Sequence, residues 1–334
     1  MAIAGVAAVT YLTLNSKQSL AYVAKPLPPA PPTLNKQDYD ARMMRLAHYV
    51  PVSSTTASTT RPRWPVAAPY PELGAVLPFK RVIAFYGNFL SKGMGVLGQY
   101  PEDVMLAKLN TEMAAWAAAD PQTPVIPAID YIAVTAQASA GRDGMYRAQM
   151  SDRQIDHAVE LARKIHGIVV LDVQVGLSTL PKELSELRKY LAYPDVHLAI
   201  DPEFAMQHGA KPGSEIGTFD AVEINYAANF LAQIVRENHL PPKILVVHRF
   251  TQEMMTHYKK ITPLPEVQMV IDMDGWGDPQ KKIGTYVNIV ADEPVQFTGF
   301  KLFFKNDILP PSTRLLTPRE VINLTPSPIF IQYQ

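Results

Sequence analysis

Pairs of acidic residues spaced two apart end two of the apolar segments of this chain. Asp201 and Glu203 end one such segment, and Asp272 and Asp274 end another. Residues two apart point to the same face of a strand, so the members of each pair lie roughly 6–7 Å apart along it. Ionised carboxylates are rarely buried unless they are paired, bind a metal ion or serve a function. The pairs therefore predict a site at which carboxyl groups transfer protons or hold a cation.

Further polar side chains stand at the ends of the other apolar segments. We expect the catalytic groups to be Glu203, Asp201, Asp272 and Asp274. We expect substrate to be bound by Tyr86, Asn88, Asp130, Asp172, Gln174, His248, Arg249, Trp276, Lys301 and Gln332. Trp276 follows Asp274 closely, and an exposed indole is a surface on which sugar rings stack. Lys301, Lys305 and Arg249 either neutralise the acids or bind an anionic substrate.

A divalent metal ion is the alternative to acid–base chemistry by carboxyl groups alone. Asp172, Asp201, Glu203, His248 and Asp272 would supply oxygen ligands and one imidazole, which suits several divalent metals. However, the chain has neither the HxH nor the HExxH spacing, and it contains no cysteine that could bind zinc. A histidine in such a place also serves often as a hydrogen-bonding residue of the structure. The sequence therefore favours a site without a cofactor.

The polar ends belong to eight short apolar segments separated mostly by helix-like ones. The apolar segments are 81–87, 125–134, 168–176, 196–204, 243–250, 267–277, 295–304 and 328–334. The helical ones are 101–119, 151–166, 180–191, 219–238, 251–260, 279–290 and 318–323, and Ser151 with Gln154 forms a capping-box pattern. Strands that alternate with helices pair in parallel, and eight such units predict a (β/α)8 barrel. Active sites of that fold lie where the carboxyl ends of the strands meet.

The triplet Asp201-Pro202-Glu203 resembles the end of the chitinase-like glycoside hydrolase motif. In that motif an Asp-x-Glu sequence on the fourth barrel strand carries the catalytic acid. The two earlier aspartates of the motif are absent, because Val196 and Ala199 stand in their places. The resemblance implies that Glu203 is the general acid and Asp201 its partner, with a second carboxylate supplied by the other acidic pair.

The whole barrel portion is similar to a family of exported bacterial proteins. The segments VIAFYGN, DVQVGLS, IDPEFAM, VVHRFT and QFTGFKLFFKND carry this resemblance. It implies the barrel fold and export, but no activity. The acidic pairs and the Asp201-Pro202-Glu203 triplet lead us to expect a carbohydrate-active enzyme of the glycoside hydrolase type. The alternatives are a metal-dependent hydrolase, lyase or isomerase, and a non-catalytic barrel that binds cell-surface polysaccharide.

Composition narrows the range of partners to a carbohydrate or another small polar substrate. The chain has 31 basic and 31 acidic residues, which argues against binding to nucleic acid or to an anionic membrane. The absence of cysteine excludes disulfides and cysteine nucleophiles. Residues 93–98 match G-x-G-x-x-G, but Tyr100 and Pro101 separate them from the next helix, so we expect no dinucleotide. We expect a mobile glycine-rich loop over the barrel mouth instead.

The N-terminal quarter predicts export. Residues 2–14 are apolar but short for a membrane span, and Ser19 and Ala21 suit cleavage by a signal peptidase, although a basic start is missing. We interpret residues 1–24 as a signal peptide or membrane anchor, which places the protein outside the cell or on its envelope; a buried strand or helix is the alternative. Residues 25–79 form a linker rich in Pro, Ser and Thr, with a short helix at 38–49, and residues 80–334 form the barrel. No eighth helix follows the eighth strand, so we expect residues 38–70 to cover the outer face there.

Overall fold

The protein is a closed barrel of eight parallel strands in a computed structural model that describes residues 33–49, 63–206 and 208–334. The barrel strands are β1 (Arg81–Gly87), β2 (Val125–Ala136), β4 (Ile168–Val173), β5 (Val196–Ile200), β7 (Lys243–Arg249), β9 (Val267–Met273), β10 (Phe297–Leu302) and β11 (Phe330–Tyr333). The barrel closes because β1 pairs in parallel with both β2 and β11. The predicted (β/α)8 fold is therefore confirmed. The predicted signal peptide or anchor (residues 1–24) lies outside the described residues.

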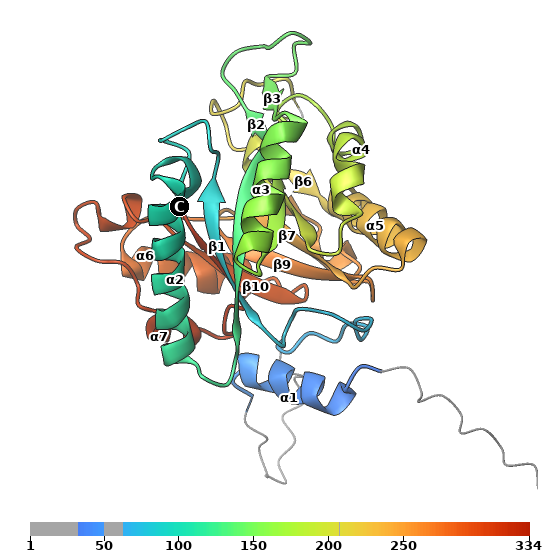
Figure 1. Cartoon of the computed structure of the whole chain (residues 1–334). Helices are drawn as coiled ribbons and strands as arrows, with labels where there is room; N and C mark the ends of the chain where they lie inside the picture. The colour runs from blue at the N-terminus through green and yellow to red at the C-terminus, as the bar shows by residue number, and fades with distance from the viewer. Residues whose placement is uncertain (1–32, 50–62, 207) are drawn as a thin grey trace, which may run out of the picture. The chain divides into compact units, whose positions relative to one another are not determined.

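Helices pack on the outside of the strands (Figure 1). They are α2 (Glu102–Ala119), α3 (Asp152–Lys164), α4 (Leu180–Leu191), α5 (Ala221–Asn238), α6 (Pro279–Thr285), which continues into a π-helical turn (Tyr286–Val290), and α7 (Pro318–Ile322). Each lies within a few residues of its predicted range. Nowhere in the described ranges is a helix both long enough and apolar enough to cross a membrane.

Two local predictions were wrong. Residues 251–260 form no α-helix: β8 (Met255–Thr256) pairs with β6 (Phe219–Asp220), and a 3-10 turn (Tyr258–Lys260) follows. The guanidinium of Arg249 donates to the carbonyl oxygens of Thr251 and Gln252, which holds the start of this segment in a turn. Ser151 stands at the N-terminus of α3, but its side chain makes no capping hydrogen bond.

The N-terminal extension closes the floor of the barrel. Helix α1 (Lys36–Leu46) places Tyr39, Met43 and Leu46 in one hydrophobic cluster with Val82, Ile244 and other interior residues near the starts of the strands. The backbone carbonyl of Leu46 also accepts a hydrogen bond from Ser327 N, at 2.6 Å. The extension thus packs on the barrel. Of residues 38–70, which were predicted to cover the outer face of β11, α1 lies at the floor instead, and residues 50–62 lie outside the described residues.

Helices α2 and α7 cover that outer face. Ile331 and Tyr333 of β11 share a hydrophobic cluster with Trp116 of α2 and Val321 of α7. Trp116 Nε1 donates a hydrogen bond to Tyr333 Oη at 2.9 Å. Because the helix after β1 and the helix before β11 meet here, the eighth strand is buried without a helix of its own.

Candidate active site

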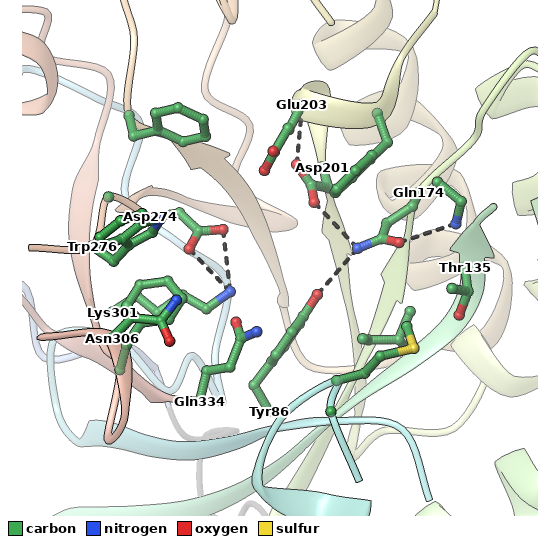
Figure 2. Close-up of a pocket in the computed structure, with 18 of the residues that line it drawn as sticks. Tyr86, Thr135, Gln174, Asp201, Glu203, Asp274, Trp276, Lys301, Asn306 and Gln334 are labelled. Atoms are coloured by element: carbon green, nitrogen blue, oxygen red, sulfur yellow. Dashed lines mark hydrogen bonds and ion pairs between the residues drawn. The ribbon is translucent and has the colours of Figure 1, made fainter. Parts of the chain in front are cut away.

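A cavity of about 800 Å³ opens at the carboxyl ends of the barrel strands. Glu203 and Asp201 lie on one side of it, and Asp274 lies with Lys301 on another (Figure 2). Tyr86, Gln174 and Trp276 complete the set of predicted site residues that line the cavity. The sequence thus identified seven of the lining residues, including three acids from two different strand ends.

The end of β5 places Asp201 and Glu203 by a turn rather than by strand alternation. The strand stops at Ile200, and Pro202 begins a short 3-10 helix (Pro202–Phe204) that Asp201 caps. Asp201 Oδ1 accepts a hydrogen bond from Glu203 N at 3.0 Å. The shared orientation of the pair was predicted, but it arises because this cap folds Glu203 back to the cavity wall.

Gln174 connects Asp201 to the neighbouring strands. Its Nε2 lies 3.4 Å from Asp201 Oδ2 and 3.3 Å from Tyr86 Oη, and it donates to both. Its Oε1 accepts from Ala136 N, at the end of β2, at 3.0 Å. Asp201 is therefore held through both of its oxygens, which fixes the wall from which Glu203 projects.

Asp274 is held by two basic side chains. Lys301 Nζ lies 3.0 Å from Asp274 Oδ1, and His248 Nδ1 lies 3.4 Å from Asp274 Oδ2. Lys301 Nζ also lies 3.8 Å from the centroid of the Tyr86 ring, which adds a cation–π contact. Asp274 is thus an ion-paired carboxylate at the cavity wall.

A second group of predicted residues is buried beneath the cavity and does not line it. Here Asp172 Oδ2 lies 2.7 Å from His248 Nε2, and Gln332 Nε2 donates to Asp130 Oδ2 at 2.6 Å. Asp272 is also fully buried, and its Oδ2 lies 3.4 Å from His248 Nδ1. These residues were predicted to touch substrate or to catalyse, but they form a polar layer that supports the cavity from inside the barrel.

Asp272 fits only because β10 has a glycine opposite it. A Cβ atom at Gly299 would lie 2.3 Å from Asp272 Oδ1. The two residues are register partners on β9 and β10. The glycine of β10 therefore leaves room in the barrel for the buried carboxyl group.

Burial and mutual repulsion make several of the acids hold their protons. Burial, followed by the charge of Asp274, raises the pKa of Glu203 to about 7. Burial and the charge of Asp172 raise the pKa of Asp130 to about 8. Burial also raises the pKa of Asp201 well above its ordinary value and raises that of Asp272. Glu203 is therefore a carboxyl group at the cavity wall that exchanges a proton near neutral pH.

The two cations stay charged despite their burial. Burial lowers the pKa of His248, but the charge of Asp172 and its hydrogen bond outweigh this effect and bring the pKa well above the ordinary value. For Lys301, burial likewise lowers the pKa, while Asp274 and Asp272 raise it further, and the net result is an increase. The site therefore combines proton-holding acids with two fixed positive charges.

Two predicted binding residues have other roles. Arg249 points away from the cavity and pairs with Glu293 at 2.6 Å. Asn88 is buried, and its Nδ2 donates to Ile132 O at 3.0 Å. Neither lines the cavity.

The glycine-rich loop lies at the cavity, as expected, with Gly93 and Met94 in its wall. A Cβ atom at Gly95 would lie 2.3 Å from Tyr86 O, so the glycine lets the loop pack closely on the end of β1. Its predicted mobility stays a prediction.

Six other polar residues line the cavity but were not predicted as site residues from the sequence. They are Thr135, Gln137, Lys281, Thr285, Asn306 and Gln334. Most of them belong to loops or helices beyond the strand ends, and no spacing rule connects such positions to a site. Gln334 could have been found, since it stands two residues after Gln332 and so shares its face of the eighth strand.

Within the described part of the chain, no group of three or more His, Asp or Glu side chains is arranged to hold a metal ion. The five predicted ligands are divided between the cavity wall and the buried layer. No protein-family model and no curated protein matches this chain. The interpretation of the site accordingly depends on its own geometry.

Proposed function

We propose that the protein is a carbohydrate-active enzyme of the glycoside hydrolase type, which cleaves a glycan with carboxyl groups at the barrel mouth. One observation carries the proposal. The same cavity contains Glu203, a carboxyl group whose pKa is about 7, and Asp274, a carboxylate paired with Lys301. Glycosidic cleavage needs one carboxyl group that donates a proton and a second that acts as base or nucleophile.

In this mechanism Glu203 donates its proton to the oxygen of the leaving group. Its raised pKa keeps it protonated up to about neutral pH, as a general acid requires. Asp274 stabilises the positive charge that develops on the sugar. It then either takes a proton from the water that attacks the anomeric carbon, or bonds to that carbon itself and is later released by water. Asp201 positions the acid through its hydrogen bond to Glu203 N.

The cavity suits a short stretch of a glycan. Its volume of about 800 Å³ lies within the range of roughly 300–1,000 Å³ that is usual for small-ligand sites. Trp276 lines the cavity and is 49% exposed, and Lys281 Nζ lies over its ring at 5.0 Å from the centroid, so a sugar would stack on the part of the ring that Lys281 leaves open. Amide and hydroxyl groups such as those of Gln174, Gln334 and Thr135 are suitable partners for sugar hydroxyls. The predicted signal or anchor would bring the enzyme to glycans outside the cell.

The test is hydrolysis by the full chain and by three variants, measured on a panel of polysaccharides and of aryl glycosides with good leaving groups. We expect the wild type to release reducing sugar. Glu203→Gln should lose roughly 100- to 10,000-fold on natural glycans, the usual contribution of a general acid. It should keep much more activity on dinitrophenyl glycosides, whose leaving group needs little protonation. Asp274→Asn should lose activity on both.

Glu160→Gln is the matched control, because Glu160 is exposed on α3. It should behave as the wild type does. Full activity of a folded Glu203→Gln variant would refute the assignment of the acid. A wild type that binds a polysaccharide without cleaving it would replace the proposal by a binding function, and a strict requirement for a divalent metal would replace it by metal-dependent catalysis.

A further inference from the structure

His248 connects the buried layer to the cavity wall. It is fully buried and does not line the cavity. Its Nε2 lies 2.7 Å from Asp172 Oδ2, and its Nδ1 lies 3.4 Å from both Asp272 Oδ2 and Asp274 Oδ2. The imidazole thus bridges three carboxyl groups, of which only Asp274 reaches the cavity.

The contacts of the ring define its protonation. Nε2 faces a carboxylate oxygen at the distance of a charge-assisted hydrogen bond, so this nitrogen carries a proton. Nδ1 makes no hydrogen bond, but it lies within ion-pair distance, 3.4 Å, of one oxygen each of Asp272 and Asp274, which favours a proton there as well. The ring is therefore an imidazolium ion.

The other charged and titratable groups around the ring are mainly acidic. Tyr86 lies edge-on at a centroid distance of 6.1 Å, and the charge of His248 also acts on Asp130, Asp201 and Glu203. Lys301 is the neighbouring cation, and it shares Asp274 with the ring.

We propose that His248 is a positioning residue of the candidate active site: anchored by Asp172, it holds the carboxylate of Asp274 toward the cavity on the side facing Glu203. This inference rests on the proposed function. Lys301 also binds Asp274, at 3.0 and 3.2 Å; its side chain is only 2% exposed, but it forms part of the cavity wall. His248 does not line the cavity, so a substrate that contacts Lys301 leaves the ion pair between His248 and Asp274 in place.

The first test is kinetic and uses His248→Gln, with Asp172→Asn as a second variant that removes the negative charge beside the ring but leaves an oxygen that can accept its hydrogen bond. We expect kcat to fall by roughly 100-fold in His248→Gln, comparable to the loss of one preorganised electrostatic contact. KM should change by less than about threefold, because the residue does not touch substrate. Asp172→Asn should lower kcat in the same way but by less. His197→Gln is the matched control: His197 is also buried on the inner face of the barrel but lies on β5 away from the cavity, and this variant should keep the wild-type kcat.

The second test needs no substrate. The chemical shift of the side-chain carboxyl carbon of Glu203 is followed against pH by NMR, in protein labelled with carbon-13 at its glutamate residues. Loss of the imidazolium charge should raise the titration midpoint of Glu203 in His248→Gln and leave it unchanged in His197→Gln. If the wild type cleaves no glycan, the proposed function fails and this titration alone decides on the link between His248 and the cavity.

Two outcomes would overturn the inference. One is a folded His248→Gln variant with wild-type kcat, and the other is a Glu203 midpoint that does not move. Folding is checked by circular dichroism, and if His248→Gln does not fold, Asp172→Asn carries both readouts.

Discussion

Replacing Asp130 with asparagine should stabilise the protein at neutral and alkaline pH. Asp130 is fully buried, and burial together with the charge of Asp172 raises its pKa from 3.8 to about 8. A carboxyl group with a raised pKa binds a proton more tightly in the folded state, so stability falls as pH rises between the unfolded and the folded pKa. The two values differ by about four pH units at about 1.4 kcal/mol each, which corresponds to a loss of about 6 kcal/mol. Asparagine has the same shape, can still accept the hydrogen bond from Gln332, and does not titrate.

The assay is the free energy of unfolding from denaturant titrations between about pH 4 and pH 9. The wild type and Asp130→Asn should agree within about 1 kcal/mol near pH 4, and the variant should be several kcal/mol more stable near pH 8. Asp103→Asn, an exposed change at the start of α2, is the control and should follow the wild-type curve. Parallel curves for Asp130→Asn and the wild type would show that Asp130 is not protonated in the folded protein, and the account of the buried layer would be wrong.

Four further predictions concern the cavity and the barrel. Activity should fall about tenfold per pH unit above about pH 7, since the acid Glu203 then loses its proton; a pH profile of kcat/KM that stays flat to about pH 9 would contradict this role. Trp276→Ala should raise KM roughly tenfold with little change in kcat, measured by steady-state kinetics, because the loss of one stacking contact of about 1.4 kcal/mol corresponds to that factor. Gly299→Ala should displace Asp272 and lower the thermal midpoint, whereas an unchanged midpoint would contradict the close contact. Met43→Ala on the barrel floor should cost about 2–5 kcal/mol of stability and leave kcat unchanged in the folded fraction.

The barrel could be predicted from the sequence because its strands are short, apolar and regularly separated. β1 begins and ends at the predicted residues, and α4 matches its predicted range. Predictions were wrong where a long-range contact decides the local structure. The segment after β7 pairs with the two residues before α5, and α1 packs against residues near the starts of the barrel strands. Neither of these two contacts produces a periodic pattern in the sequence.

The candidate site was predictable in its residue types but not in its depth. Alternation shows which residues face the inside of a barrel, and both Asp272 and Asp274 do so. It does not show where the interior ends and the cavity begins. Asp274 follows the last residue of β9 and reaches the cavity, whereas Asp272 lies two residues deeper and is sealed from it. A rule of spacing therefore places both acids on one face but cannot separate a catalytic group from a supporting one.

Two buried charged clusters of the barrel differ in their balance of acidic and basic groups. Lys282 Nζ lies 2.7 Å from Asp307 Oδ2 and donates to the carbonyl oxygens of Gly275 and Lys301. The oxygens of Asp307 in turn accept from the backbone N–H groups of Gly277 and Phe303, so this pair is balanced and fully bonded. It braces the loop that carries Trp276, as a structural ion pair does.

The acids at the barrel mouth follow a different pattern. Six carboxyl groups, those of Asp130, Asp172, Asp201, Glu203, Asp272 and Asp274, share two cations, His248 and Lys301. Within the described residues, Oδ1 of Asp130, Oδ1 of Asp172 and both side-chain oxygens of Asp272 have no hydrogen-bond partner. A core selected for stability alone would replace such groups, because uncompensated buried charge is costly. Burial, together with the charge of Asp274, keeps a proton on Glu203 up to about pH 7, and an acid in that state is useful where a bond must be protonated.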